Sequence, residues 1–224
     1  MRTPTPQYVG WVDVMGARSS MLRSLSESAN FVGKLHGAAL SVLQRYAAVK
    51  LYPMIDGLYG RCASQAPILG FLKEVFFRVG LTFVAEREHL HRFCIRGGLA
   101  YGPVVIGDDI RGASTVLSQN ANYCSSILLG TTLSQAFDTA GEAAPFGIAL
   151  HESVRAFAPS GDPVLSGTHW KWWRFIRDGN LLLPLLKSRL AQYHKWCKTH
   201  SSSMIYKEDR IEAHNKLMID FFSD

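Results

Sequence analysis

Two aspartates, Asp13 and Asp56, occupy positions from which carboxylates can bind a metal ion together. Asp13 is the last residue but one of the apolar stretch YVGWVDV, and Asp56 precedes Gly57 between the apolar runs VKLYPMI and LYG. An Asp-Gly pair between two apolar runs is typical of a β-hairpin, so one carboxylate is expected at a strand end and the other at a hairpin tip. A pair of hard oxygen ligands suits Mg²⁺ or Mn²⁺. The alternative is that Asp13 caps a helix and Asp56 only forms a turn.

The segment after Asp13 is a candidate phosphate-binding loop. Here the chain changes from a strand to a turn that can open a helix. Backbone N–H groups at such a turn favour an anion. The expected stretch runs from Val14 to Ser19 and includes Met15, Gly16, Ala17 and Arg18. Carboxylates beside a loop of this kind indicate nucleoside-triphosphate chemistry.

Tyr52 is expected on the same strand face as Asp56, because side chains alternate between the faces of a strand. At ~3.3 Å per residue, Tyr52 lies about 13 Å along the strand from Asp56. Ile55 falls on the other, apolar face, which should meet the helices. Pro53 implies an edge or a bulge and can shift this register by one residue.

The rest of the chain alternates between strand-like and helix-like patterns. We expect strands over 8–14, 91–100, 104–106 and 146–154, a hairpin over 46–63, and helices over 19–47, 65–88 and 128–139. The first helix should be interrupted near 26–30, a turn is expected at Gly102-Pro103, and the polar stretch 108–126 is expected to be a loop. This order predicts an α+β fold in which helices pack on one face of a mixed β-sheet. No helix of the pattern is expected to cover the other face.

The sequence changes character after about residue 166. Residues 167–224 hold four of the five tryptophans and end in the apolar pattern IEAHNKLMIDFF. We predict a sheet domain over 1–166 and a helical C-terminal extension over 167–224, packed on that domain or on a partner subunit. Core or dimer packing is the favoured role of the tryptophan cluster.

The composition fits a soluble globular protein. The chain has 224 residues, 47% apolar and 19% charged, and a net charge of +6 without a single Lys/Arg run. This charge suits an anionic partner such as a nucleotide, and no nucleic-acid tail is indicated. The four cysteines lack metal-binding spacing, which predicts reduced, buried thiols. No apolar run approaches the ~20 residues of a spanning helix, and MRTPTPQ lacks a signal-peptide segment, so a cytoplasmic location without a membrane partner is expected.

Three segments, taken in order, resemble motifs of the class III nucleotidyl cyclases. YVGWVDVMGARSSM resembles their first metal-binding segment, VKLYPMIDGLYG their second, and FCIRGGLAYGPVVIGD their Gly-rich strand pair. Order and spacing agree over about residues 8–155. The resemblance implies a nucleotidyl cyclase catalytic domain over 1–166, with a ferredoxin-like core.

The resemblance also implies roles for the two aspartates. Asp13 and Asp56 would hold two divalent cations, Mn²⁺ or Mg²⁺, with the Val14 carbonyl as a further ligand. These ions would activate the ribose 3′-hydroxyl and stabilise charge on the α-phosphate as pyrophosphate leaves. Residues 14–18 would hold the β- and γ-phosphates. Because this family works as head-to-tail dimers whose sites span both subunits, a homodimer is implied.

The sequence departs from the family pattern at the base-reading positions. The lysine that reads a purine is replaced by Tyr52, and its partner residue maps near Ile127, before Gly130. Neither position supplies the purine-reading pair.

It also departs where the family stabilises the transition state. The family's asparagine and arginine map to Ser134 and Asp138. Arg96 could supply the missing positive charge and is the third catalytic candidate. The alternative is that Arg96 is a solvated or ion-paired strand residue.

A tyrosine at the base position and a Trp/Leu-rich tail resemble the pyrimidine cyclases of bacterial Pycsar anti-phage systems. This implies conversion of a pyrimidine nucleoside triphosphate, UTP favoured over CTP, into a cyclic nucleotide such as cyclic UMP, which acts on a separate effector protein. Two alternatives remain, a purine (ATP or GTP) cyclase of the same fold and a catalytically silent nucleotide- or nucleic-acid-binding module.

Overall fold

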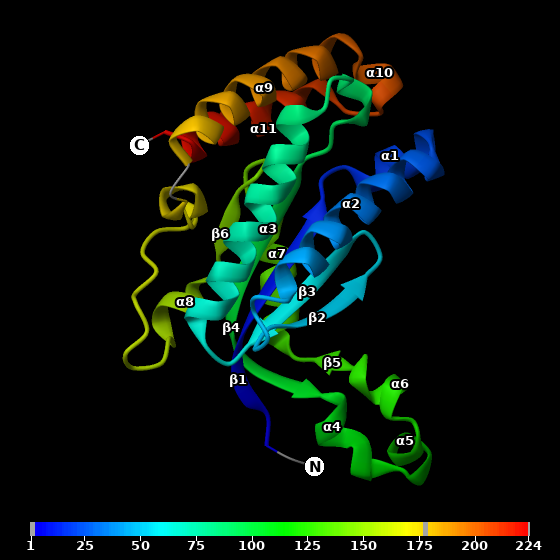
Figure 1. Ribbon diagram of the computed structural model, residues 1–224, viewed down its shortest axis with the longest axis vertical. Coiled ribbons are helices and arrows are strands. Elements are labelled where there is room, and N and C mark those ends of the chain that lie inside the picture. The colour runs from blue at the N-terminus through cyan, green and yellow to red at the C-terminus, as the bar shows by residue number, and fades with distance from the viewer. Residues whose placement is uncertain (1–2, 177–178, 224) are drawn as a thin grey trace.

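The computed structural model describes residues 3–176 and 179–223. Residues 1–2 and 177–178 and residue 224, which belong to the expected domain 1–166 and extension 167–224, lie outside the described residues. Its centre is a mixed sheet of strand order β2-β3-β1-β4-β5, with β6 added parallel to β4 (Figure 1). The strands are β1 (Thr5–Val14), β2 (Lys50–Met54), β3 (Gly57–Cys62), β4 (Ile95–Ile106), β5 (Leu128–Leu129) and β6 (Ile148–Leu150). The predicted α+β fold is confirmed.

One face of the sheet is covered by long helices. They are α2 (Leu25–Leu43), α3 (Gln65–Ala85) and α9 (Gly179–Thr199). Tyr8 and Val12 of β1 point into the same core as Phe76 and Phe83 of α3 and Leu186 of α9. The larger hydrophobic core therefore lies between this sheet face and the three helices.

The other face of the sheet is partly covered by α7 (Thr131–Ala140), where the sequence analysis expected no helix. Val9 and Trp11 alternate with the residues of the larger core and pack against Leu133 and Ala136 of α7. The approach is close because β4 has a glycine there. A Cβ atom on Gly98 would lie 2.1 Å from the carbonyl oxygen of Ala136.

Several shorter expectations were wrong in detail. β4 runs unbroken through Gly102 and Pro103 instead of turning there. Pro103 lies opposite Pro6 of β1, and a pair of residues that exchanges no backbone hydrogen bonds tolerates the missing N–H groups. The expected loop over 108–126 contains short helices, namely α4 (Gly107–Ile110), η2 (Arg111–Ala113), α5 (Thr115–Gln119) and α6 (Ala121–Ser125).

The first predicted helix is divided earlier than expected, at Ser24. α1 (Ala17–Arg23) ends there and α2 begins, because the Ser24 side chain accepts a hydrogen bond from the Glu27 N–H at 3.3 Å. The predicted strand over 146–154 is reduced to β6, and α8 (Glu152–Ala156) follows it.

The C-terminal extension begins at the sheet and continues as helices. Trp170 N–H donates to the Ile148 carbonyl of β6, and the Trp172 indole donates to the Phe146 carbonyl at 2.7 Å. The remaining elements are η1 (His89–His91), η3 (Trp172–Phe175), α10 (Ser201–Met204) and α11 (Glu208–Phe221). α9, α10 and α11 gather at the end of the molecule where α1 lies (Figure 1).

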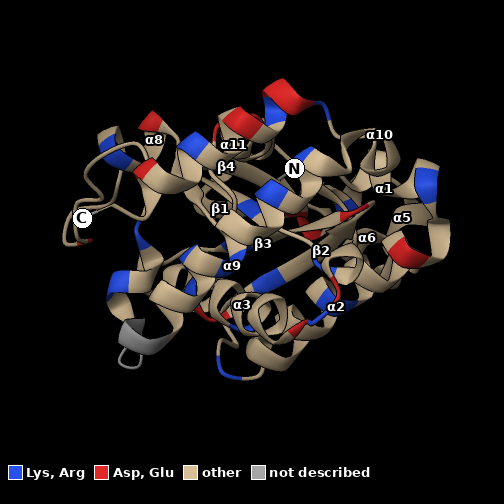
Figure 2. Cartoon of the chain, turned by 90° about the horizontal axis from the view of Figure 1, so that it is seen from above, with Lys and Arg blue, Asp and Glu red and all other residues tan. Residues whose placement is uncertain are grey.

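Charge is spread over the described part of the protein, and its helices are not of the membrane-spanning kind. Basic positions are distributed over several elements and interspersed with acidic ones (Figure 2). None of the helices in residues 3–176 and 179–223 is both long and apolar enough to cross a membrane. The four cysteines are free and buried, as predicted.

Candidate active site

Asp13 lies at the end of β1, between the tip of the β2–β3 hairpin and the start of β4. It faces Gly57 of β3 on one side and Arg96 of β4 on the other, and only 6% of its surface is exposed. A Cβ atom on Gly57 would lie 2.4 Å from the Val12 carbonyl oxygen, so only glycine allows the hairpin to approach β1 this closely. The Asp-Gly pair in the sequence thus serves close strand packing.

Asp56 lies in the hairpin turn beside Asp13. The turn residues are Ile55 and Asp56, one position earlier than predicted, and Ile55 has a positive φ of 46° and 92% exposure. The Asp56 carbonyl accepts a hydrogen bond from the Val14 N–H at 3.3 Å, which ties the turn to the end of β1. The structure therefore brings together Asp13, Val14 and Asp56.

Arg96 forms a two-pronged ion pair with Asp13. Its Nε donates to Asp13 Oδ1 at 3.1 Å and its Nη2 to Oδ2 at 3.3 Å. Burial raises the pKa of Asp13 above its ordinary value, the Arg96 charge opposes this rise, and the nearby Asp56 charge adds to it. The third catalytic candidate thus contacts the first, in the ion-paired state that the sequence analysis gave as the alternative.

The donor set suits a magnesium-like ion that brings part of its own coordination shell. Among the described residues, no group of three or more His, Cys, Asp and Glu side chains is placed to hold a metal ion. Two carboxylates and the Val14 carbonyl offer oxygen atoms alone, which Mg²⁺ and Mn²⁺ accept while keeping water or phosphate oxygens. Arg96 now occupies both oxygens of Asp13, so binding of an ion there requires the guanidinium to move.

The predicted phosphate loop turns sharply away from β1. The Met15 N–H already donates to the Cys94 carbonyl at 2.8 Å, and Gly16 has a left-handed φ of 73°. Ala17 is buried, whereas Gly16 and Arg18 are exposed. The outer part of the loop, Gly16 to Arg18, is therefore the part that a ligand can reach.

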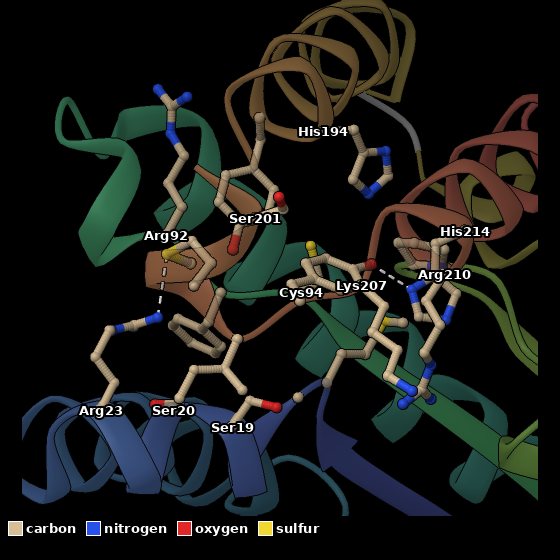
Figure 3. Close-up of a pocket in the computed structure, with 18 of the residues that line it drawn as sticks. Ser19, Ser20, Arg23, Arg92, Cys94, His194, Ser201, Lys207, Arg210 and His214 are labelled. Carbon is tan, nitrogen blue, oxygen red and sulfur yellow. Dashed lines mark hydrogen bonds between the residues drawn. The ribbon is translucent and has the colours of Figure 1, made fainter. Parts of the chain in front are cut away.

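A cavity of about 630 Å³ borders this loop. Met15, Gly16 and Ser19 line one side of the cavity (Figure 3). Lys207, which precedes α11, and Arg210 of α11 line the other. Sequence reasoning missed this second wall. Nothing in the pattern of residues 167–224 indicates that they return to the first strand.

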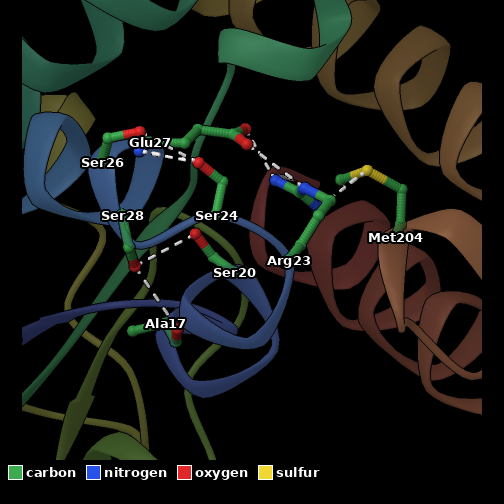
Figure 4. A network of polar contacts seen from close by, with 8 residues as sticks. All are labelled: Ala17, Ser20, Arg23, Ser24, Ser26, Glu27, Ser28 and Met204. Atoms are coloured by element: carbon green, nitrogen blue, oxygen red, sulfur yellow. Dashed lines mark hydrogen bonds and ion pairs between the residues drawn. The ribbon is translucent and has the colours of Figure 1, made fainter.

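A network of polar contacts holds α1 against its neighbours (Figure 4). Ser20 Oγ donates to Ser28 Oγ at 3.0 Å, which joins α1 to α2. Arg23 pairs with Glu27 at 2.6 Å and donates to the Met204 sulfur at 3.1 Å, which joins α1 to α10. The contact between Arg23 and Met204 thus links α1, on the side of the phosphate loop, to α10 of the C-terminal extension.

Tyr52 lies within the smaller core and does not contact the two aspartates. It is 7% exposed and packs with Trp11, Tyr59 and Leu133. Its hydroxyl accepts a hydrogen bond from Arg61 Nε at 2.9 Å. The face that Tyr52 was expected to share with open solvent is the face that α7 covers, because Leu133 and Ala136 pack there.

The other positions at which the sequence departs from the family pattern lie on or near α7. Gly130 is the N-cap of this helix, with a φ of 150°. Ser134 and Asp138 are exposed on the helix, and Ile127 is half-buried before it. Within this chain, neither Ser134 nor Asp138 is among the residues that line the cavity beside the phosphate loop.

Comparison with solved structures identifies the fold. No protein-family model and no curated protein matches the chain. A guanylate cyclase domain from Catenaria anguillulae in complex with GTP is 15% identical, over 68% of this chain and 81% of that one, with a TM-score of 0.50. A guanylyl cyclase domain of the RhoGC fusion protein from Blastocladiella emersonii, in a dimer of non-standard arrangement, is 16% identical over 68% and 83%, with the same TM-score.

A bacterial light-regulated adenylyl cyclase is 13% identical over 66% of this chain and 77% of that one, with a TM-score of 0.52. These structures are cyclase catalytic domains of class III. At such low identity the likeness concerns the fold, which is therefore that of the class III nucleotidyl cyclase domain.

Proposed function

We propose that the protein is a metal-dependent nucleotidyl cyclase that converts a pyrimidine nucleoside triphosphate, UTP in preference to CTP, into a 3′,5′-cyclic nucleotide and pyrophosphate. The observation that carries the proposal is the meeting of Asp13 and Asp56 at the end of β1, on a cyclase fold. A cyclase fold that had lost its activity would not need two buried or half-buried carboxylates side by side.

In this proposal Asp13, Asp56 and the Val14 carbonyl hold two divalent cations, Mn²⁺ or Mg²⁺. When bound, such ions lower the pKa of the ribose 3′-hydroxyl and neutralise charge on the phosphates. The 3′-oxygen forms a bond to the α-phosphorus while the bond from that phosphorus to the bridging oxygen breaks. The hydroxyl proton passes to solvent, and pyrophosphate leaves.

The chain's own cationic and amide groups position the triphosphate. Arg96 pairs with Asp13, and once it releases the carboxylate its guanidinium is free to pair with a phosphate oxygen. The backbone N–H groups of Gly16 and Arg18, both exposed residues, are proposed as the other donors of the loop. Arg96 thus takes part of the role that Ser134 and Asp138 cannot fill.

The hydrogen bond at Tyr52 supports uracil over cytosine. Because Arg61 donates to the Tyr52 hydroxyl oxygen, the hydroxyl proton is available to donate to a base. Uracil, like thymine, presents a carbonyl acceptor at position 4, whereas cytosine presents an amino donor there. We propose Tyr52, on the sequence resemblance, as the residue that reads the base and UTP as the substrate; the 7% of Tyr52 that is exposed is the part that a base would have to reach.

The active form is proposed to be a homodimer with shared sites. Ile55 and Met54 at the hairpin and Phe137 on α7 are apolar and exposed, which suits burial against a second copy. The dimeric cyclase domain from Blastocladiella emersonii has the same fold. The role in anti-phage defence, the separate effector that the product activates and the cytoplasmic location stay predictions from the sequence resemblance.

The test is to incubate the purified protein with Mn²⁺ or Mg²⁺ and each of ATP, GTP, CTP and UTP, and to identify products by mass spectrometry. We expect cyclic UMP from the wild-type protein and none from Asp56→Ala. Cyclic AMP or cyclic GMP would contradict the role of Tyr52 and leave the metal site intact. The absence of any cyclic product, with phage components also added, would contradict the cyclase.

A further inference from the structure

The wall of the cavity opposite the phosphate loop carries two cationic side chains. Lys207 directly precedes α11, and Arg210 lies in its first turn. Both line the cavity that Met15 and Gly16 border, and both are exposed. Figure 3 labels both among the residues that line the cavity. A ligand in the cavity would therefore meet the phosphate loop on one side and two positive charges on the other.

In the part of the chain that the structure describes, these two side chains have no hydrogen-bond or ion-pair partner, unlike Arg23 and Arg92 of the same cavity. Arg23 pairs with Glu27, and Arg92 donates to the Glu86 carbonyl at 2.6 Å and 3.1 Å. Within residues 3–176 and 179–223, neither the Lys207 nor the Arg210 side chain forms an ion pair or a hydrogen bond. The acidic neighbour Glu208, which also lines the cavity, accepts from Ser201 at 3.5 Å.

His214 of α11 also lines this cavity, whereas Asp13, Asp56 and Arg96 do not. Burial, together with the charges of Arg210, His194 and Arg96, lowers the pKa of His214 to about 4. The charges of Arg210 and of Arg96, the arginine paired with Asp13, both disfavour the protonated form of His214. Its ring also forms a hydrogen bond with the Tyr206 hydroxyl. At neutral pH His214 is uncharged, so the positive charge of this wall comes from Lys207 and Arg210.

We infer that Lys207 and Arg210 bind the triphosphate chain of the substrate, and then the leaving pyrophosphate, against the loop at Met15 and Gly16. The inference rests on the proposed function, which requires a triphosphate at this loop. The positions that the resemblance assigns to the family's asparagine and arginine hold Ser134 and Asp138, and neither lines this cavity. The C-terminal extension therefore supplies cations that α7 does not, from the same chain as the phosphate loop.

The test compares two double variants that remove the same charge. Lys207→Gln/Arg210→Gln alters the wall, and Lys195→Gln/Lys216→Gln removes two exposed lysines of α9 and α11 that do not line the cavity. Binding of inorganic tripolyphosphate is measured by calorimetry at one ionic strength, and KM for UTP is measured alongside. We expect the wall variant to bind about tenfold more weakly for each cation removed, since a hydrogen bond to a charged group is worth about one such factor.

The conservative pair Lys207→Arg/Arg210→Lys should restore most of the binding, and the control pair should change it little. Tripolyphosphate binding that is equal in the wall and control variants, or no binding by the wild-type protein, would overturn the inference. An unchanged KM for UTP in an active wall variant would also overturn the inference, but it would not contradict the proposed cyclase activity. Selective loss of tripolyphosphate binding without any cyclic product from the wild-type protein would support the wall and contradict the cyclase.

Discussion

The ion pair between Arg96 and Asp13 predicts how Arg96→Gln will behave. In the wild-type protein the guanidinium covers both carboxylate oxygens of a side chain that is almost wholly buried. Glutamine can replace one hydrogen bond but no charge. The variant should therefore be less stable without metal, and it should bind Mn²⁺ more tightly, because the competitor for Asp13 is gone.

The size of the loss follows from the geometry. Two charges about 4 Å apart attract each other by about 4 kcal/mol at an effective dielectric constant of ~20. Removing one partner of a buried pair costs about 3–5 kcal/mol. The Arg96 side chain is 24% exposed, and Asp13 can take up a proton, so about 2 kcal/mol is expected at pH 7. For a chain of this size that corresponds to a fall in Tm of about 4–8 °C.

The effect should depend on pH in a defined direction. The pKa of Asp13 is raised in the folded protein, so its protonated form favours folding and its ionised form is the one that needs Arg96. The difference between wild type and Arg96→Gln should shrink as the pH falls through the pKa of Asp13. Urea unfolding in EDTA at several pH values measures it, and Asp13→Asn with the double variant completes a thermodynamic cycle.

Three results would refute this reasoning. One is an unfolding midpoint of Arg96→Gln equal to that of the wild type at pH 7. Another is a cycle in which the two substitutions are additive. The third is an unchanged Mn²⁺ affinity, which would show that the guanidinium does not compete for Asp13.

Asp56→Asn should weaken Mn²⁺ binding at least tenfold, measured by calorimetry, with little change in Tm, because its half-buried carboxylate has no ion pair among the described residues to lose. Gly98→Ala should lower stability by about 1–3 kcal/mol in urea unfolding, because its Cβ meets the Ala136 carbonyl, whereas Gly112→Ala, with open space around it, should not. His214 has a folded pKa of about 4 against about 6.5 when unfolded, so its stability term is complete above pH 6.5 and is lost towards pH 4. His214→Gln should therefore flatten the Tm profile in that window, and parallel profiles would contradict this.

Local patterns predicted most of the sheet and the meeting of the two carboxylates. Alternating apolar residues identify β1 and the hairpin, and Asp56-Gly57 indicates a tip that can lie beside Asp13. These features depend on neighbours in the sequence or on strand pairing, which period and turn chemistry reveal. The turn was misplaced by one residue because a β-branched residue with positive φ at Ile55 is contrary to ordinary preference.

Long-range packing was outside the reach of such patterns. α7 covers the second face because Gly98 has no Cβ atom and the backbone at Ala136 can therefore approach β4. The two residues are almost forty positions apart, and the local pattern around neither of them indicates the contact. The same holds for Lys207 and Arg210, which are ordinary charged residues until α11 folds back over the phosphate loop. The sequence also left the state of Arg96 ambiguous, because a solvated strand arginine and one that is paired with a carboxylate look alike in sequence.

The cavity beside the phosphate loop has a consequence for the order of events on the ribosome. Its walls, at Met15–Gly16 and Lys207–Arg210, come from the two ends of the described chain. At about 5–20 residues per second, the segment with Asp13, Asp56 and Arg96 emerges several seconds before α11. During that time Arg96 can already neutralise Asp13, whereas the cavity has only one wall. A nascent chain thus has Asp13 paired with Arg96 and its anion pocket open, and the pocket closes only when translation has passed α11.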